Sequence, residues 1–250
     1  MIIHKSPDEI DRMRRAGRVV AATIQRLQEA VRPGVTTAQL DRLAEEAIRS
    51  AGAAPSFKGY RGFPGSICTS LNEQVVHGIP GSRVLRVGDL LSLDVGAIWD
   101  GYHADSAISM FVGEPPSAEA EKLVRVTEES LEAGNGQIRP GGRLSDISHA
   151  VQETAEGAGF SVVREYVGHG IGRSLHEDPQ IPNFGPPGRG PELRAGLVVA
   201  VEPMVNLGGW QTRVLADEWT VVTADGSLSA HFEHTIALLE NGAEVLTARE

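Results

Sequence analysis

Two aspartates, Asp94 and Asp105, lie eleven residues apart on either side of an Asp100-Gly101 pair. An Asp-Gly pair between two alternating segments is the usual signal for a two-residue hairpin turn. If this pair forms the turn, Gly96 pairs with Asp105, and Asp94 lies diagonal to Asp105. The Cβ atoms of the two acids are then roughly 7 to 8 Å apart. Two carboxylates at that distance need a cation or a proton.

Side chains alternate along a strand, so the two faces of the hairpin carry different residues. The face predicted to pack against a core carries Leu91, Leu93, Val95, Ala97, Ala104, Ser106, Ile108 and Met110. The opposite face carries the two acids among small residues, namely Ser92, Asp94, Gly96, Asp105, Ala107 and Ser109. The alternative is an exposed face on which both acids are solvated. A β-bulge would also change which side chains share a face of the hairpin. A metal site therefore requires further ligands from elsewhere in the chain.

The composition is that of a globular protein, and its 250 residues can bury a large core in one domain or in two packed halves. The formal net charge is −10 without a Lys/Arg-dense run, which argues against direct nucleic-acid binding and against an anionic membrane surface. Cys68 is the single cysteine, so an internal disulfide is impossible. No apolar run is long enough to span a membrane. We therefore expect a cytoplasmic protein. We also expect it to be a monomer.

Two helices are predicted near the start of the chain. Ser6 and Thr36 each begin a capping box, with Glu or Gln three residues later. The first helix is expected to stop near Val31–Gly34, which contains an Arg-Pro-Gly sequence, and the second near Gly52. Strand-like segments follow this helix pair.

The same layout returns about 107 residues later. Helices are predicted over 117–136 and from about 145 to 157 or 159, and Ile138–Gly141 repeats the Arg-Pro-Gly stop. Two copies of helix pair and strands predict an α+β architecture with an internal pseudo-two-fold, although two copies can arise by chance. A cleft between the halves is a natural place for ligands to converge. We predict one catalytic domain, 1–250, with halves of approximately 6–112 and 117–240.

Three more residues of metal-ligand type lie in or next to strand-like segments. His169 lies between glycines, Glu202 follows the apolar run Leu197–Val201, and Glu233 lies within Ser229–Ile236. The GxGxG spacing around His169 does not fit a dinucleotide loop. Each residue alone could be a solvated acid or a loop histidine. Together with the two aspartates they are the donor set expected for two divalent ions that share carboxylates.

Five segments of the sequence together form a family signature: Asn72–Pro80, Asp94–Ala107, Gly168–Glu177, Val201–Met204 and Phe232–Thr235. In this order, over nearly the whole chain, they resemble type I methionine aminopeptidases, which are M24 metallopeptidases. The resemblance implies the pita-bread fold, with two pseudo-two-fold related halves and a curved antiparallel sheet flanked by helices. That expectation agrees with the internal repeat.

The resemblance also implies a role for each ligand position. By motif position, Asp94 binds one metal, Asp105 and Glu233 bridge both, and His169 and Glu202 complete the second. Co, Mn, Fe, Zn and Ni are all candidates for the two divalent ions, because oxygen and imidazole ligands accept several metals. The implied catalytic residues are Glu202, which relays a proton, with His176 and His77, which contact the substrate.

The resemblance implies that the protein removes the N-terminal Met from polypeptides, with preference for a small second residue. Nascent polypeptides, at the ribosome, are then the expected partners. Positions that match the family's methionine pocket are Phe57, Tyr60, Phe63, Cys68, Leu175 and Trp219. Several of them could equally be core residues. Phe57 stands where some relatives carry cysteine and Leu175 where some carry an aromatic residue, which leaves the shape of the pocket open.

Two other functions remain as alternatives. An X-Pro aminopeptidase or prolidase resembles this fold and uses the same five ligands, but such enzymes usually carry an extra N-terminal domain, whereas helical sequence begins here at Ser6. A non-catalytic pita-bread module that binds peptides is the second alternative. Such modules typically lose ligands, and all five ligand positions are present in this chain.

Overall fold

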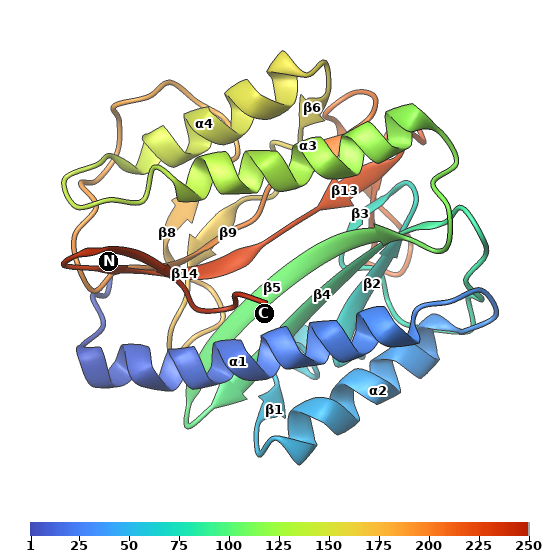
Figure 1. The fold of residues 1–250 in the computed structure, drawn as a ribbon, viewed down its shortest axis with the longest axis horizontal. Coiled ribbons are helices and arrows are strands. Elements are labelled where there is room, and N and C mark those ends of the chain that lie inside the picture. The colour runs from blue at the N-terminus through green and yellow to red at the C-terminus, as the bar shows by residue number, and fades with distance from the viewer. Residues whose placement is uncertain (250) are drawn as a thin grey trace.

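The computed structural model describes residues 1–249, so Glu250, the last residue of the predicted domain, lies outside the described residues. The helices are α1 (Pro7–Ala30), α2 (Thr37–Ser50), the short 3-10 helix η1 (Tyr60–Gly62), α3 (Ala118–Asn135) and α4 (Leu144–Gly157). Figure 1 shows α1 and α2 in the lower half of the view and α3 and α4 in the upper half, with strands between the two pairs.

The helix starts follow the capping chemistry predicted from the sequence. Ser6 Oγ accepts a hydrogen bond from Glu9 N, and the Glu9 carboxylate accepts one from Ser6 N. Thr36 and Gln39 form the same reciprocal pair at the start of α2. Such bonds satisfy backbone N–H groups that have no partner within the helix. The predicted boundaries of both helices are confirmed to within about two residues.

Antiparallel pairing joins the strands into sheets. One sheet contains β1 (Ala54–Pro55), β2 (Ile67–Leu71), β4 (Leu90–Trp99) and β5 (Tyr102–Phe111). Another contains β7 (Gly168–Gly170), β8 (Glu177–Ile181), β9 (Val198–Val201), β14 (His234–Leu239) and β15 (Gly242–Val245). Two smaller sheets contain β6 (Ser161–Val162), β10 (Met204–Asn206) and β13 (Ser229–His231), and β3 (Gln74–Val76), β11 (Thr212–Val214) and β12 (Val221–Thr223).

The two larger sheets meet where β5 and β14 lie side by side near the middle of the molecule (Figure 1). Ala107 and Glu233 exchange backbone hydrogen bonds of 3.3 and 3.0 Å across this junction. The sheet formed by the first half of the chain is therefore hydrogen-bonded at this junction to the sheet formed by the second half. The predicted α+β class is confirmed, and its central junction carries one bridging candidate, Glu233, directly beside the strand of the other, Asp105.

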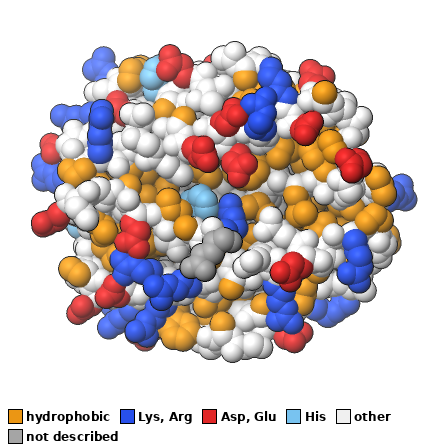
Figure 2. All heavy atoms as spheres, viewed as in Figure 1, with side chains coloured by type: hydrophobic (Ala, Val, Ile, Leu, Met, Phe, Trp, Pro, Cys, Tyr) orange, Lys and Arg blue, Asp and Glu red, His pale blue; other side chains and the backbone are white. Residues whose placement is uncertain are grey.

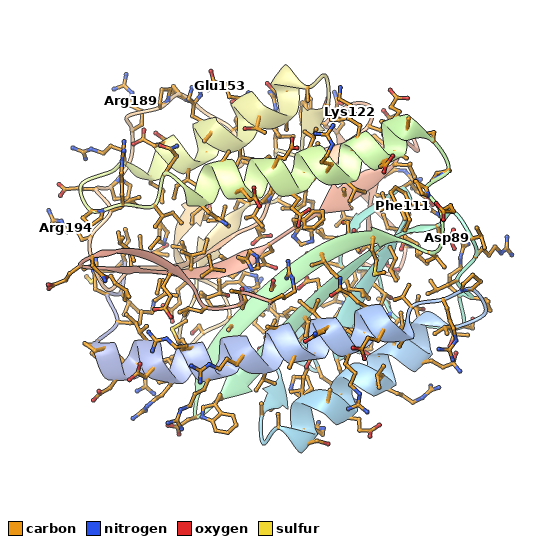
Figure 3. All side chains as sticks on the ribbon, viewed as in Figure 1. Asp89, Phe111, Lys122, Glu153, Arg189 and Arg194 are labelled. Carbon is orange, nitrogen blue, oxygen red and sulfur yellow. The ribbon has the colours of Figure 1, made fainter. Side chains whose placement is uncertain are left out.

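One face of the β4–β5 hairpin packs against helix α1, as the alternation predicts. Leu93, Val95 and Ala104 on the hairpin and Val20 and Ile24 on α1 belong to one buried apolar cluster. Burial of apolar area on this scale is the main favourable contribution to folding. Figure 3 shows side chains filling the space between helices and strands, while Lys122 on α3 and Glu153 on α4 point outward. The other face of the hairpin, which carries Asp94 and Asp105, lines a cavity.

The surface mixes charges of both signs. Figure 2 shows acidic side chains among Lys and Arg side chains on the face that carries the helices. Within residues 1–249, no helix combines the length and the apolarity needed to cross a membrane.

The N-terminal arm is tied to the rest of the fold by Lys5. Its backbone N–H donates to Gly196 O at 2.7 Å, and its Nζ lies 2.8 Å from Glu177 Oε2. Both side chains of this ion pair are almost completely buried. The other carboxylate oxygen, Oε1, accepts a hydrogen bond from Ser174 N at 3.1 Å. Glu177 thus connects the arm to the loop that precedes β8.

Replacing Lys5 by Met should lower the free energy of unfolding by about 3 to 5 kcal/mol, because the buried Glu177 carboxylate is left without its cation. Urea denaturation of the variant and the wild type measures this difference. The double variant Lys5→Met/Glu177→Gln is the control, since it removes both charges and should recover part of the loss. A single variant as stable as the wild type would refute the proposed anchoring role.

Candidate metal centre

The hairpin that carries Asp94 and Asp105 has the predicted register. Gly96 pairs with Asp105, and Asp94 pairs with Ala107, so the two acids lie diagonally on the same face. Asp100 and Gly101 have φ values of 47° and 78°, as a hairpin turn with two left-handed residues requires. The register runs from Leu90 to Phe111 without a bulge. The prediction that both acids lie on one face of the hairpin is confirmed.

The other three candidate ligands come from the second larger sheet and its borders. His169 is the central residue of β7, rather than a loop residue. Glu202 directly follows β9. Glu233 lies at a break between β13 and β14, so the predicted continuous strand over 229–236 is divided into two. The break directs the chain from one sheet into the other at the position of the carboxylate.

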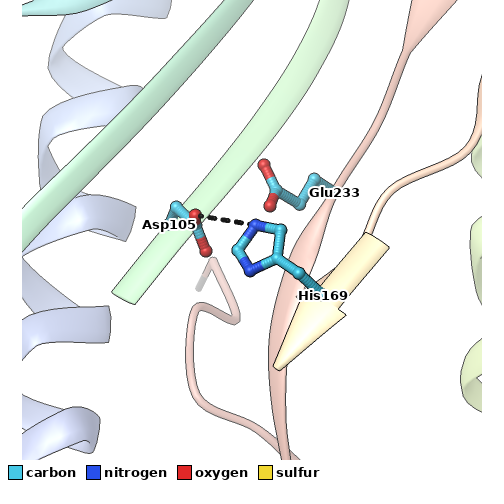
Figure 4. Close-up of side chains that lie close together, drawn as sticks. All are labelled: Asp105, His169 and Glu233. Carbon is cyan, nitrogen blue, oxygen red and sulfur yellow. Dashed lines mark ion pairs between the residues drawn. The ribbon is translucent and has the colours of Figure 1, made fainter. Parts of the chain in front are cut away.

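These side chains converge on one point. Figure 4 shows Asp105, His169 and Glu233 turned toward one another, and one ligand atom from each lies within 4.8 Å of the others. His169 Nε2 is 3.7 Å from Asp105 Oδ2 and 3.4 Å from Glu202 Oε1. Asp94 pairs in register with Cys68 on β2 and lines the same cavity. The five residues singled out in the sequence are therefore neighbours, although their ligand roles stay predictions.

His169 presents a lone pair to the carboxylates. Its Nδ1 lies 2.9 Å from the carbonyl oxygen of Gly170, which can only accept, so Nδ1 carries the proton. Burial lowers the pKa of His169 to about 4, so the ring is neutral at neutral pH. Nε2 is then an unprotonated nitrogen that faces Asp105 and Glu202. A backbone carbonyl behind the ring is the usual way to fix the tautomer of a metal-binding histidine.

The glycines beside His169 allow neighbouring strands to approach β7 closely. A Cβ on Gly168 would clash with the carbonyl oxygen of Ala200 on β9, and one on Gly170 would clash with that of Asp178 on β8. The flanking glycines therefore serve the packing of β7 between β8 and β9. This packing holds the His169 ring in position.

Asp105 is held by Thr235, on the adjacent strand β14. The Thr235 hydroxyl lies 3.0 Å from Asp105 Oδ1 and 2.8 Å from the Asp105 carbonyl oxygen, and it accepts a hydrogen bond from Asp105 N at 3.0 Å. Thr235 is fully buried. Thr235 was not predicted from the sequence, although its place two residues after Glu233 was a usable signal.

The buried carboxylates repel one another. Burial, and then the charge of Asp105, raises the pKa values of Asp94, Glu202 and Glu233 well above their ordinary values. Burial raises the pKa of Asp105 itself to about 6. Among the described residues, no cationic Lys or Arg side chain pairs with any of these four carboxylates. A cation bound among the four carboxylates would relieve this repulsion.

The surroundings of the Asp94 carboxylate show whether these residues fit a metal ion. Its Oδ1 atom is buried and has no hydrogen-bond partner among the described residues. An unpartnered buried carboxylate oxygen is costly unless it coordinates a cation. Carboxylate oxygens with one imidazole are a normal donor set for divalent metals. The cluster therefore fits divalent metal binding.

The cluster forms one wall of a cavity of about 360 Å³. The other walls include every residue predicted for the methionine pocket, namely Phe57, Tyr60, Phe63, Cys68, Leu175 and Trp219. Phe63 and Trp219 pack edge to face with ring centroids 5.1 Å apart. An apolar, aromatic recess beside a polar cluster can bind one apolar side chain and hold its backbone at the polar groups.

His77 and His176 also line this cavity. The His176 ring lies 4.2 Å from the His169 ring, centroid to centroid. His77 has a φ of 60°, a left-handed conformation that is uncommon outside glycine, and its ring packs edge-on near Trp219. Desolvation in the cavity lowers the pKa values of both histidines to about 4. Both rings are therefore neutral and can donate or accept hydrogen bonds.

Two further residues line the cavity that the sequence analysis did not identify, Arg61 and Gln180. Arg61 lies in a segment with glycines at positions 59 and 62, which was a signal for a tight turn. Gln180 lies on β8, where its side chain is exposed. Nothing in the local sequence of β8 distinguishes Gln180 as a cavity residue.

The comparisons with known proteins agree with this geometry. The model of metallopeptidase family M24 matches residues 11–240 of the chain. The chain is 58% identical to methionine aminopeptidase 1 of Bacillus subtilis, with 99% of each chain covered. It is 49% identical to methionine aminopeptidase 1 of Mycobacterium tuberculosis, with 99% of this chain and 95% of that protein covered.

Solved structures give the same result. The crystal structure of methionine aminopeptidase from Thermotoga maritima matches with a TM-score of 0.97 and 49% identity over 100% of both chains. Prolidase from Pyrococcus furiosus matches with a TM-score of 0.81 and 21% identity, and covers 99% of this chain but 66% of the prolidase. The second similarity is one of fold alone.

Proposed function

Since this chain belongs to metallopeptidase family M24 and is similar throughout its length to methionine aminopeptidases, we propose that it removes Met from the N-terminus of polypeptides with two divalent ions. By the family resemblance, Asp94 would hold one ion, Asp105 and Glu233 would hold both, and His169 and Glu202 would complete the second site. The observation that carries this proposal is the buried cluster of carboxylates around the neutral His169, with the unpartnered Asp94 oxygen at its edge.

The ions, when bound, supply a Lewis acid for the scissile carbonyl and lower the pKa of a water molecule toward neutrality. The protein must then accept the proton of that water. Glu202 suits this role because its carboxylate lies in the cluster, beside the ions that it would help to hold, where it can accept that proton. Its Oε1 lies beside His169, inside the cavity.

His176 and His77 contact the peptide on the open side of the cluster. Each ring is neutral, so each has one N–H donor and one acceptor nitrogen. A donor aimed at the carbonyl oxygen stabilises the negative charge that develops there in the transition state. Loss of such a donor typically lowers kcat by about 10² to 10³-fold.

The apolar recess binds the Met side chain. Phe57, Phe63 and Trp219 supply aromatic walls, and thioether sulfur packs favourably against aromatic rings. Occupation of this recess holds the first residue of the substrate beside the ions. A requirement for a free amino group at that residue restricts cleavage to the first peptide bond, and a preference for a small second residue is what the family resemblance implies.

The direct test is a panel of peptides with the metal-loaded protein. Met-Ala-Ser should release free Met, while N-acetyl-Met-Ala-Ser should not, because its amine is blocked. Met-Leu-Ser should be cleaved at least about tenfold more slowly if the space beyond the first residue is small, since each tenfold step in rate corresponds to about 1.4 kcal/mol. Mass spectrometry of the products measures all three rates, with Mn, Co or Fe as the added metal.

Other results of the same panel would contradict the proposal. Rapid cleavage of Gly-Pro peptides with none of Met-Ala-Ser would favour an X-Pro aminopeptidase or prolidase. Binding of two ions without turnover of any peptide would favour a non-catalytic binding module. The 21% identity to a prolidase supports only a shared fold, whereas the full-length similarity to methionine aminopeptidases supports Met removal.

The organisation and setting of the enzyme are part of the same proposal. Residues 1–250 act as one catalytic domain, with pseudo-repeat halves of approximately 6–112 and 117–240 that each contribute ligands. The protein acts in the cytoplasm as a monomer on nascent polypeptides, near the ribosome. The single cysteine, which excludes an internal disulfide, supports a reducing compartment.

A further inference from the structure

Tyr60 makes a hydrogen bond inside the cavity that its role in a methionine pocket does not require. Its hydroxyl oxygen lies 2.8 Å from His176 Nδ1, and the two ring centroids are 5.4 Å apart. The His176 ring in turn packs at a tilt against the His169 ring, whose Nε2 faces the carboxylates. The hydroxyl therefore connects the wall of the apolar recess to the histidine beside the metal cluster.

A rigid turn holds Tyr60 in this position. Phe57 O accepts a hydrogen bond from Tyr60 N, and Tyr60 O accepts one from Phe63 N, each at 2.9 Å. Gly59, Arg61 and Gly62 all have positive φ values, of 85°, 49° and 92°. Such a run of left-handed residues is costly for the non-glycine member, Arg61, and marks a conformation that the surrounding structure enforces.

The chemistry of the pair decides which group donates. A neutral imidazole has one N–H and one lone pair, and a phenol hydroxyl is a strong donor to that lone pair. The Arg61 guanidinium lies 5.4 Å from the centroid of the Tyr60 ring, and a cation over the ring withdraws electron density from the phenol. These features favour Tyr60 as the donor and His176 Nδ1 as the acceptor, an arrangement that leaves the N–H proton of His176 on Nε2.

We propose that Tyr60 is a positioning residue: its hydroxyl donates to His176 Nδ1 and so presents the Nε2–H of His176 to the scissile carbonyl. The inference rests on the proposed peptidase function and assigns the donor within that site. An imidazole free to turn about its χ2 angle could offer either nitrogen to the substrate. The bond to Tyr60 selects one orientation, and it comes from the same turn that forms the recess for the Met side chain.

Tyr60→Phe is the test, because it keeps the ring in the recess and removes only the hydroxyl. We expect kcat for Met-Ala-Ser to fall about tenfold, the factor that corresponds to one ordinary hydrogen bond, and KM to change less than about threefold. The control is Tyr102→Phe, which removes the hydroxyl that donates to Glu9 Oε1 at 2.6 Å outside the cavity. Its kcat should stay within about twofold of the wild type.

A second readout does not depend on activity. In metal-free protein labelled with 15N-histidine, long-range 1H–15N spectra should show His176 with its proton on Nε2 and a hydrogen-bonded Nδ1. A His176→Gln variant identifies these signals among the eight histidines. In Tyr60→Phe the Nδ1 resonance should move to the position of a nitrogen without a hydrogen bond, and in Tyr102→Phe it should not move.

The outcomes separate the two hypotheses. A proton on Nδ1 in the wild type, or a kcat loss in Tyr60→Phe without a change in the His176 signals, would overturn the positioning role. A changed spectrum with wild-type kcat would overturn it as well. Wild-type protein that releases no Met would contradict the proposed function, whereas the spectra would still report on the Tyr60–His176 bond.

Discussion

Replacing Asp105 by Asn should lower the rate of Met release from Met-Ala-Ser by about 10³-fold or more, which corresponds to at least about 4 kcal/mol of transition-state stabilisation. Asp105 is the proposed bridge between the ions, and an amide supplies neither the charge nor two equivalent oxygens. The side chain keeps its size and can keep its hydrogen bond to Thr235, so the fold should persist. The loss therefore reports on the metal site itself.

The measurement is kcat/KM together with the metal content of the purified variant. Asp146→Asn is a matched control, because the Asp146 carboxylate accepts hydrogen bonds from Arg143 N and Gly188 N at the start of α4 and does not line the cavity. Its activity should stay near that of the wild type. Normal turnover in Asp105→Asn would refute the assignment of Asp105 as a bridging ligand.

The same substitution should stabilise the protein when metal is absent. Burial raises the pKa of Asp105 to about 6, against about 3.9 for an unfolded aspartate. A group with a raised folded-state pKa contributes stability that is fully present below the unfolded value and is lost as the pH rises through the folded value. Ionised Asp105 thus destabilises the metal-free wild type at pH 7.5 by on the order of 3 kcal/mol.

Urea denaturation in a chelating buffer measures this effect as a difference between wild type and Asp105→Asn. The variant should be the more stable protein at pH 7.5, and the gap should shrink as the pH falls from about 6 to about 4. Histidines that the Asp105 charge does not reach titrate alike in both proteins and cancel, whereas the pKa of His176 is raised by that charge and differs between them. A variant less stable than the wild type at pH 7.5 without metal would contradict the electrostatic account.

Divalent metal should reverse the order. An ion that binds the folded wild type at a concentration 1,000 times its Kd adds about 4.1 kcal/mol of stability, and the variant lacks the ligand needed to gain as much. The cluster is therefore unfavourable for the metal-free fold and favourable for function, as is common for active sites.

Much of the fold was predictable because local chemistry determined it. The Asp100-Gly101 turn and the period of two specified the register of β4 and β5, and the capping boxes at Ser6 and Thr36 specified where helices begin. The pita-bread fold implied by the family resemblance is confirmed by the match to the methionine aminopeptidase structure, with a TM-score of 0.97.

Other parts depend on contacts between distant residues. The pairing of Lys5 with Glu177 joins residues 172 positions apart, and the bond from Thr235 to Asp105 spans 130. No local pattern encodes such neighbours. The break at Glu233 was missed for a similar reason, since the residues around it are as strand-like as those of β14, and only the junction of two sheets requires the chain to change direction there.

Titration of the metal-free protein with Mn²⁺, with bound ions and released Met measured in the same samples, shows whether Met release depends on ions held by the cluster. We expect no release of Met from Met-Ala-Ser without bound metal, and release that appears as ions bind and reaches its maximum by two ions per chain. Rapid release from protein that holds no divalent ion would contradict this dependence.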